Sequence, residues 1–268
     1  MPSGLKPMVF SNDDSKPSPR GRKPARRGPS AHDLAEISAA TEADFHLMHH
    51  EATEHFMHDR KGEALGVARD ALIKASERPG PFEAVVIISY LPLLISLAPE
   101  DTSRKAAHRA GLLVTGRPGC EYFVSYAHFY ALQIEIRADK KDAAFAEADA
   151  CIKAALLSEK HCTWLASSWR YHGMLLALKG NRVEAIISLS NAVRSASENP
   201  VDDPLVLARA HDAAGQIMMD LRQWQLAEES FLNAIEEYRK QAPEGAAEAA
   251  ETWKRAAQVR EIRKGMGE

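Results

Sequence analysis

Cysteine is scarce in this chain of 268 residues. The three present, Cys120, Cys151 and Cys162, are an odd number and form no CxxC pair, so their spacing does not indicate a disulfide framework. A chain of this length can bury enough apolar surface to fold without covalent cross-links. We therefore expect free thiols and a reducing compartment, which would be the cytoplasm, or the nucleus if the source is eukaryotic.

Long apolar runs are also missing. Residues 8–10 are apolar but are followed at once by Asn12 and two aspartates, so they do not form the core of a secretory signal. The uncharged run from Ala84 to Ala98 is 15 residues long and contains Pro92, whereas a bilayer-spanning helix needs ~18 to 20 residues. We expect a buried helix there and no membrane partner.

Signals for strands and for catalysis are equally sparse. No Asn-Gly or Asp-Gly hairpin turn occurs, and the one marked β-branched run is residues 85–88. The sequence contains no GxSxG nucleophile elbow, no GxGxxG or GxxxxGK phosphate loop, and no cysteine in an identifiable His/Asn framework. We expect an all-α protein that is not an enzyme and needs no cofactor.

Charge and proline divide the chain near residue 31. Residues 1–31 contain seven Lys/Arg against two Asp and six of the 14 prolines, whereas residues 32–268 carry a net charge of −8. The first segment has too few large apolar side chains to offset the entropy of ordering. We expect a disordered basic arm over 1–31 and a folded body after it.

An internal repeat is visible in the body, which Pro, Gly and Asp clusters cut into helices of about 15 to 20 residues. Two segments align without gaps, 42 residues apart. The first contains Trp169, Gly173, Leu176, Gly180, Ala185, Leu189 and Ala192. The second contains His211, Gly215, Met218, Arg222, Ala227, Phe231 and Ala234 at the same offsets.

This pattern resembles the tetratricopeptide repeat (TPR), a helical hairpin with small residues at its eighth, twentieth and twenty-seventh places. Gly173 and Ala185 would stand where two antiparallel helices cross closely, and a larger side chain would cost ~1 to 3 kcal/mol of overpacking. The resemblance implies a right-handed superhelical solenoid of about five hairpins over 32–242. A capping helix over 243–268, carrying Trp253, would cover its last apolar face.

Upstream the pattern is weaker. Phe145, Ala148, Ile152 and Ala155 reproduce the second helix of the unit, but Ile136 then stands where glycine is expected. Ala64, Ala68 and Ala71 fit a still earlier second helix, and 82–114 resembles a further hairpin by its length and turns.

The resemblance also implies a function, because arrays of this family bind an extended or helical peptide in a concave groove lined by the first helices of successive hairpins. The groove positions of the three later hairpins are Arg170, Met174 and Ala177, then Asp212, Gln216 and Met219, and finally Gln133, Arg137 and Lys140. Met174 and Gln216 stand where the subtype that grips chaperone tails has asparagine, so we predict no such clamp. These residues could also be plain solvated surface.

A histidine-rich stretch suggests a metal site. His46, His50, Glu54 and His58 form an i, i+4 stripe that could hold a borderline metal ion. The HExxH motif fails, because Glu54 stands where its second histidine is required. The alternative is a solvated, pH-sensitive helix face.

The basic arm is similar to the AT-hook, in which an extended Arg-Gly-Arg enters the narrow minor groove of A·T-rich DNA. The matching residues are Arg20, Gly21, Arg22, Lys23, Arg26 and Arg27. Lys23 departs from the family core, which has proline there. The same residues could serve nuclear import or solubility.

Three hypotheses follow from the sequence. The first is a non-enzymatic adaptor that docks a partner protein or peptide in the groove. The second is a regulator that contacts A·T-rich DNA through the arm, and the third is a metal-dependent activity at the histidine face. Self-association is left open.

Overall fold

The computed structural model describes residues 31–199, 201 and 203–267. Within these residues the chain forms eleven α-helices and no β-strand. They are α1 Ala31–Met57, α2 Lys61–Ser76, α3 Pro81–Leu97, α4 Glu100–Val114, α5 Glu121–Arg137, α6 Lys141–Leu157, α7 Leu165–Leu178, α8 Arg182–Glu198, α9 Val206–Asp220, α10 Trp224–Lys240 and α11 Ala246–Met266. The all-α fold class that the sequence predicts is confirmed.

The helices belong to two compact units that divide between Pro79 and Gly80. The first unit holds α1 and α2, and the second holds α3 to α11. The sequence-based boundaries at 32–242 and 243–268 do not include this division. Of the predicted basic arm, only Ala31, the first residue of α1, lies among the described residues.

In the first unit, α1 packs against α2 through small side chains. Ala64, Ala68, Ala71 and Ala75 recur every three or four residues along α2, and all four are fully buried, as is Ala52 of α1. A face made of methyl groups lets two helix backbones approach closely. The prediction that Ala64, Ala68 and Ala71 lie on the second helix of a hairpin is confirmed.

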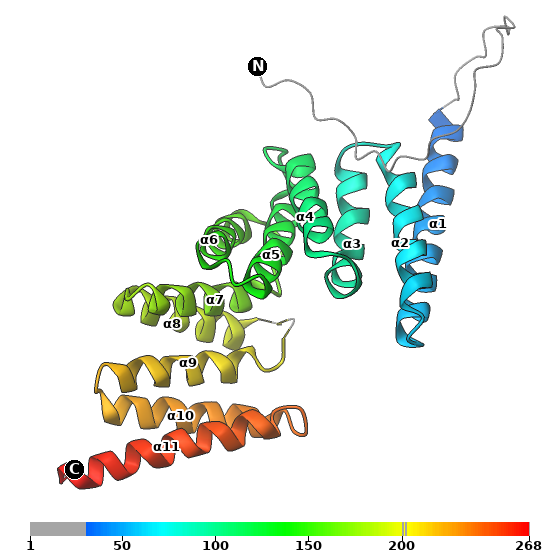
Figure 1. The fold of residues 1–268 in the computed structure, drawn as a ribbon. Helices are drawn as coiled ribbons and strands as arrows, with labels where there is room; N and C mark the ends of the chain where they lie inside the picture. Colours follow the sequence, from blue (N-terminus) through cyan, green and yellow to red (C-terminus); the bar gives the residue numbers. More distant parts are fainter. Residues whose placement is uncertain (1–30, 200, 202, 268) are drawn as a thin grey trace, which may run out of the picture. The chain divides into compact units, whose positions relative to one another are not determined.

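In the second unit, the pairs α3/α4, α5/α6, α7/α8 and α9/α10 follow one another, and α11 packs against α10. The second helix of each pair also contacts the first helix of the next, and α3 contacts α5 as α7 contacts α9. Because contacts are mainly between neighbours in the chain, the unit is a helical solenoid (Figure 1). With α1/α2, the described residues form five pairs and a final helix, as the sequence predicts.

Two glycines allow the closest helix crossings in the later pairs. A Cβ added to Gly173 would lie 3.0 Å from the carbonyl oxygen of Ala185, and one added to Gly215 would lie 2.7 Å from two ring carbons of Phe231. Non-bonded carbon atoms normally approach no closer than about 3.5 Å. The tight crossings predicted at Gly173 and Gly215 are therefore confirmed.

Four of the five pairs share one turn between their helices. A residue in the left-handed region ends the first helix, at Asp59, Asp139, Gly180 and Arg222, with φ of 58°, 52°, 84° and 58°. The following residue donates its N–H to the carbonyl oxygen five residues earlier, at 2.8 to 2.9 Å. This bond satisfies a carbonyl group that the helix end would leave unpaired. The recurring turn marks the true register of the repeats.

That register corrects the sequence analysis of the α5/α6 pair. Matching the turns at Asp139 and Gly180 places Leu132, not Ile136, at the position of Gly173, so the register inferred from the sequence is wrong by four residues. Leu132 is fully buried and packs with the small residues Ala144 and Ala148 of α6. In α7/α8 the small residue Gly173 on the first helix faces Leu189 on the second, whereas in α5/α6 the large residue Leu132 on the first helix faces small residues on the second. A sequence search for glycine on the first helix therefore misses the α5/α6 repeat.

The final helix α11 covers the end of the array. Ala256 and Val259 are buried with Phe231 of α10, and Glu228 of α10 accepts hydrogen bonds from two arginines of α11. Trp253, which the sequence suggests as part of the covering face, is 47% exposed and lies outside it. Thr252, Ala256 and Val259 form the buried face instead, because they follow the helical spacing i, i+4, i+7.

Candidate functional site

A cavity of about 340 Å³ lies between α7 and α9, the first helices of two successive pairs. It is lined by Arg170, Met174, Ala177 and Leu178 of α7 and by Arg209, Asp212, Ala213, Gln216, Ile217 and Asp220 of α9. Five of these residues, Arg170, Met174, Ala177, Asp212 and Gln216, were predicted from the sequence as groove residues. We call this cavity the α7–α9 groove.

Arg170 is the buried cation of the α7–α9 groove. The residue is only 8% exposed, its guanidinium stacks 4.1 Å from the centre of the Tyr171 ring, and its Nη1 donates to the sulfur of Met174 at 3.4 Å. Its Nε is buried without a hydrogen-bond partner. Thioether sulfur is a weak acceptor, so most of the hydrogen-bonding capacity of this guanidinium is unused within the chain.

Asp212 is held by the final helix. Its carboxylate accepts a hydrogen bond from Thr252 at 3.0 Å and from Arg255 at 2.7 and 2.8 Å, and Gln216 of α9 donates to it at 2.9 Å. Thr252 and Arg255 belong to α11, which has no counterpart in the repeat. The cap therefore fixes the position and balances the charge of a groove residue.

Arg209 supplies a second anchor in the α7–α9 groove. Its guanidinium donates to Asp203 at 2.8 Å and to Glu248 of α11 at 3.0 Å. The pKa of Glu248 lies below its ordinary value, because the hydrogen bond from Arg209 stabilises the ionised carboxylate. Both carboxylates are thus paired with Arg209 rather than with Arg170.

Tyr238 of α10 lies within the electrostatic reach of these groups. The pKa of its hydroxyl is raised to about 12, mainly by burial, with the charges of Asp212 and Glu248 adding to the increase and those of Arg209 and Arg170 opposing it. The tyrosine is 2% exposed and stays protonated at neutral pH. It therefore adds no charge to this group of residues.

The other predicted groove residues lie elsewhere. Met219 packs against the apolar cluster that α10 forms with α11, and Gln133 is half-buried on α5. Arg137 donates to the carbonyl oxygen of Ile95 in α3 at 3.0 Å. Lys140 lies in the turn after α5, beside a smaller cavity that Met174 also lines. The four-residue error in register explains the misplacement of Arg137 and Lys140.

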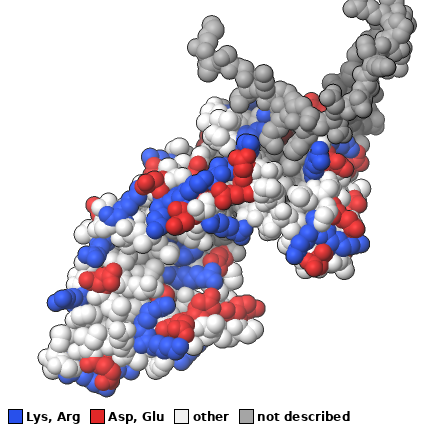
Figure 2. All heavy atoms as spheres, in the orientation of Figure 1, with Lys and Arg blue, Asp and Glu red and all other residues white. Residues whose placement is uncertain are grey.

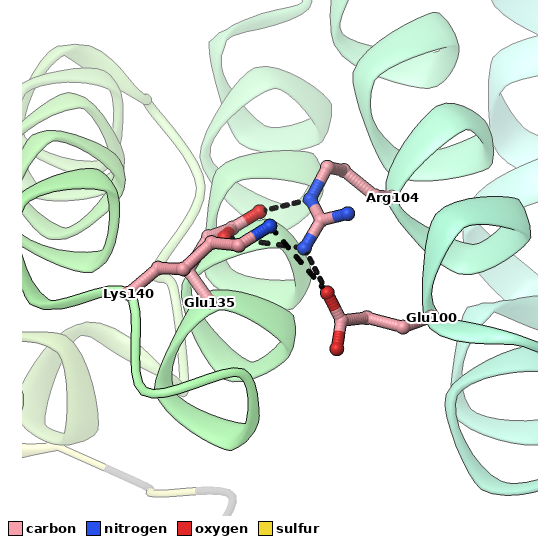
Figure 3. A network of polar contacts seen from close by, with 4 residues as sticks. All are labelled: Glu100, Arg104, Glu135 and Lys140. Carbon is pink, nitrogen blue, oxygen red and sulfur yellow. Dashed lines mark hydrogen bonds and ion pairs between the residues drawn. The ribbon is translucent and has the colours of Figure 1, made fainter.

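Lys140 belongs to an ion network that joins α4 to α5 (Figure 3). Arg104 donates through Nε to the buried Glu135 at 2.5 Å and through Nη2 to Glu100, and Lys140 Nζ lies 3.6 Å from Glu100. The hydrogen bond from Arg104 holds the pKa of Glu100 below its ordinary value. All four groups have partners within the network, which therefore joins successive pairs and presents no unpaired charge.

The predicted metal stripe does not converge. His46, His50, Glu54 and His58 extend over twelve residues, about 18 Å of helix. The Nδ1 of His58 lies 2.8 Å from the carbonyl oxygen of Glu54, and His46 and His50 are exposed. Among the residues that the structure describes, no group of three or more His, Cys, Asp or Glu could hold a metal ion. The stripe stays dispersed because residues of one helix that are more than one turn apart cannot reach a common point.

The cysteines are free thiols, and Cys151 is enclosed. Its sulfur lies 3.1 Å from Ser168 Oγ and 3.4 Å from Ser125 Oγ, and burial raises its pKa to about 12. A thiol with that pKa is protonated at neutral pH and is a poor nucleophile.

Three groups that shape the groove were missed by sequence reasoning: Arg209, Thr252 and Arg255. Arg209 could have been found, because it precedes Asp212 by one helical turn and shares its face. Thr252 and Arg255 carry no sequence signal, since their partner is 40 residues away or more and lies in the repeat rather than in the cap.

Surface charge is mixed. Figure 2 shows basic and acidic side chains interspersed on the visible face of the second unit. The AT-hook-like residues Arg20 to Arg27 lie outside the described residues. Across the part of the chain that the structure describes, no helix is both long and apolar enough to span a membrane.

The sequence matches no protein-family model and no curated protein. Solved structures do resemble the chain. Two crystal structures of MamA have TM-scores of 0.53 at 13% and 14% identity, covering 74% and 71% of this chain and 93% and 96% of theirs. A Podosopora anserina protein with nearly identical TPR-like repeats, described as a putative kinesin light chain, has a TM-score of 0.57 at 10% identity. The aligned region covers 75% of this chain and 97% of that protein.

Those likenesses establish the fold. At identities of 10 to 14%, they show that the chain has a TPR-like helical repeat fold and do not extend to its ligands. The resemblance to the tetratricopeptide repeat that the sequence suggests is confirmed at the level of the fold.

Proposed function

We propose that this chain is a non-enzymatic adaptor that binds a peptide segment of a partner protein in the α7–α9 groove. The observation that carries the proposal is the convergence of Arg170, Met174, Ala177, Asp212 and Gln216 on one cavity of about 340 Å³. These residues come from two repeats separated by 42 residues and were selected by repeat position alone.

The composition of the groove supports docking of a peptide. Met174 is 40% exposed and flexible, and it offers apolar, adaptable contact area. Gln216 is exposed and can pair with a peptide backbone, whereas Asp212 and Arg209 are held in place by α11. Five of the ten lining residues are apolar and five are polar or charged, so the groove can contact both apolar and polar parts of a peptide.

Site-specific photocrosslinking tests the proposal. A photoreactive phenylalanine analogue replaces Ala177, which lines the groove, in one protein, and Ile187, which is 57% exposed on α8, in a second. Both proteins are irradiated in native lysate, and the crosslinked partner is identified by mass spectrometry. We expect the same partner segment to crosslink from position 177 and not from position 187.

Two results would contradict the proposal. One is equal crosslinking from both positions, which would place the binding surface elsewhere. The other is a partner that crosslinks from 187 alone. The Ala177→Trp variant provides an independent check, because a bulky side chain in the groove should abolish capture of that partner, whereas Ile187→Trp should leave it intact.

A further inference from the structure

Arg170 is a charged group whose burial is not compensated inside the protein. A buried guanidinium is normally paired with a carboxylate, because removal of a charge from water is costly. Among the described residues, Arg170 contacts the Met174 sulfur and the Tyr171 ring, and no carboxylate lies within ion-pair distance of it. Its buried Nε donates to nothing.

Asp212 and Arg209 of the α7–α9 groove already have partners of opposite charge. Asp212 accepts from Arg255, and Arg209 donates to Asp203 and Glu248. Asp220 also lines the cavity but is the exposed last residue of α9, about 12 Å along the helix from Asp212. Arg170 is therefore the groove cation left without an anionic partner.

Met174 occupies the position that an anionic partner would take. Its sulfur lies 3.4 Å from Nη1 of Arg170, one helical turn away, yet the side chain is 40% exposed. A methionine side chain has three rotatable bonds and can move aside at small cost. A carboxylate that displaced it would replace a weak acceptor with one that can accept two parallel N–H bonds from the guanidinium.

We infer that Arg170 binds the side-chain carboxylate of an aspartate or glutamate in the docked peptide, with Met174 moving aside to admit it. The inference rests on the proposed function, since it specifies the ligand chemistry of that groove. It makes the partner segment acidic at one position, and the surrounding cavity, with Ala177, Ala213 and Ile217, accommodates the aliphatic part of that side chain.

Peptide selection followed by a matched substitution tests the inference. A random peptide library is displayed on phage and selected on the full-length protein. The strongest peptide is then synthesised with its acidic residue intact, changed to the amide (Glu→Gln or Asp→Asn), or changed to phosphoserine. Fluorescence anisotropy measures the Kd of each for the unaltered protein, for Arg170→Gln, and for Arg182→Gln. Arg182 is an exposed arginine on α8 and serves as the control of equal charge change.

We expect the amide peptide to bind the unaltered protein at least tenfold more weakly than the acidic one. The Arg170→Gln variant should bind the two peptides equally, and Arg182→Gln should behave as the unaltered protein. The Arg170→Gln variant should also melt at the same temperature or higher, because it removes a buried charge that has no partner.

Several outcomes overturn the inference. If Arg170→Gln melts more than about 5 °C lower, the arginine serves the fold rather than a ligand. If phosphoserine binds tenfold tighter than the acidic residue, the ligand is a phosphate. If peptides compete for the groove but tolerate Arg170→Gln, the proposed function stands and this inference fails. If no selected peptide is weakened by Ala177→Trp, the proposed function itself fails and the inference with it.

Discussion

Replacement of Gly215 by alanine should destabilise the second unit although alanine is the better helix former. The added methyl group would lie 2.7 Å from two ring carbons of Phe231, an overlap of about 1 Å relative to normal contact. Phe231 is fully buried, so its ring cannot move aside into solvent. Overpacking of this kind costs about 1 to 3 kcal/mol, and alanine recovers about 1 kcal/mol of helix propensity.

Gly111 of α4 provides the control within the same unit. A methyl group there would lie 3.8 Å from the Ala127 Cβ, which is ordinary contact, so Gly111→Ala should gain about 1 kcal/mol of stability. Both substitutions change propensity equally. The difference between the two variants therefore isolates the overlap with Phe231 and should be about 1 to 3 kcal/mol.

Denaturant unfolding followed by circular dichroism measures both variants. A double-mutant cycle with Phe231→Leu supplies a second reading, because a smaller side chain opposite position 215 should relieve the overlap and give a coupling of at least about 1 kcal/mol. The reasoning is refuted if Gly215→Ala is as stable as Gly111→Ala, or if the cycle shows additivity.

Three further predictions concern other parts of the chain. Arg222→Gly should raise the temperature of the unfolding midpoint slightly and Gly180→Ala should lower it, because a non-glycine residue with left-handed φ costs about 1 to 2 kcal/mol. Shifts of the opposite sign in thermal unfolding would disprove the role of the turn. The hydrogen bonds from two α11 arginines lower the pKa of Glu228 below its ordinary 4.5, so the stability they provide is complete above pH 4.5 and is lost as pH falls through the lowered value. Glu228→Gln should therefore weaken the acid dependence of unfolding, and an unchanged pH profile would count against this. Retention of the full chain on A·T-rich duplex at low salt should be lost in Arg20→Ala/Arg22→Ala; if the unaltered chain is not retained, the DNA hypothesis falls.

The fold was accessible from the sequence where small residues are periodic. Gly173 and Gly215 lie at helix crossings where there is no room for a Cβ atom. Only glycine satisfies that constraint, so the crossing can be recognised in the sequence. In α5/α6 the same crossing is made by Leu132 against Ala144 and Ala148, so the constraint is met by a pair of residues, and the search for single small residues misplaced the register.

The groove was partly accessible for a similar reason. Repeat position fixes which face of a helix a residue lies on, so Arg170 and Asp212 were found. Repeat position does not determine which charged side chains form ion pairs between helices that are distant in the sequence. The pairing of Asp212 with Arg255 depends on the placement of a helix outside the repeat. The lack of an ion pair at Arg170 becomes visible only when the partners of Asp212, Asp203 and Glu248 are known.

The hydrogen bonds from α11 to Asp212 couple the last helix of the array to the α7–α9 groove. If α11 were displaced, the Asp212 carboxylate would lose both Thr252 and Arg255 and would present an unbalanced negative charge to whatever occupied the groove. Arg209 would lose Glu248 of the same helix and keep only Asp203, so one negative and one positive group would be uncovered together. The terminal helix therefore neutralises charge at two points of this surface, although it contributes no residue to the lining.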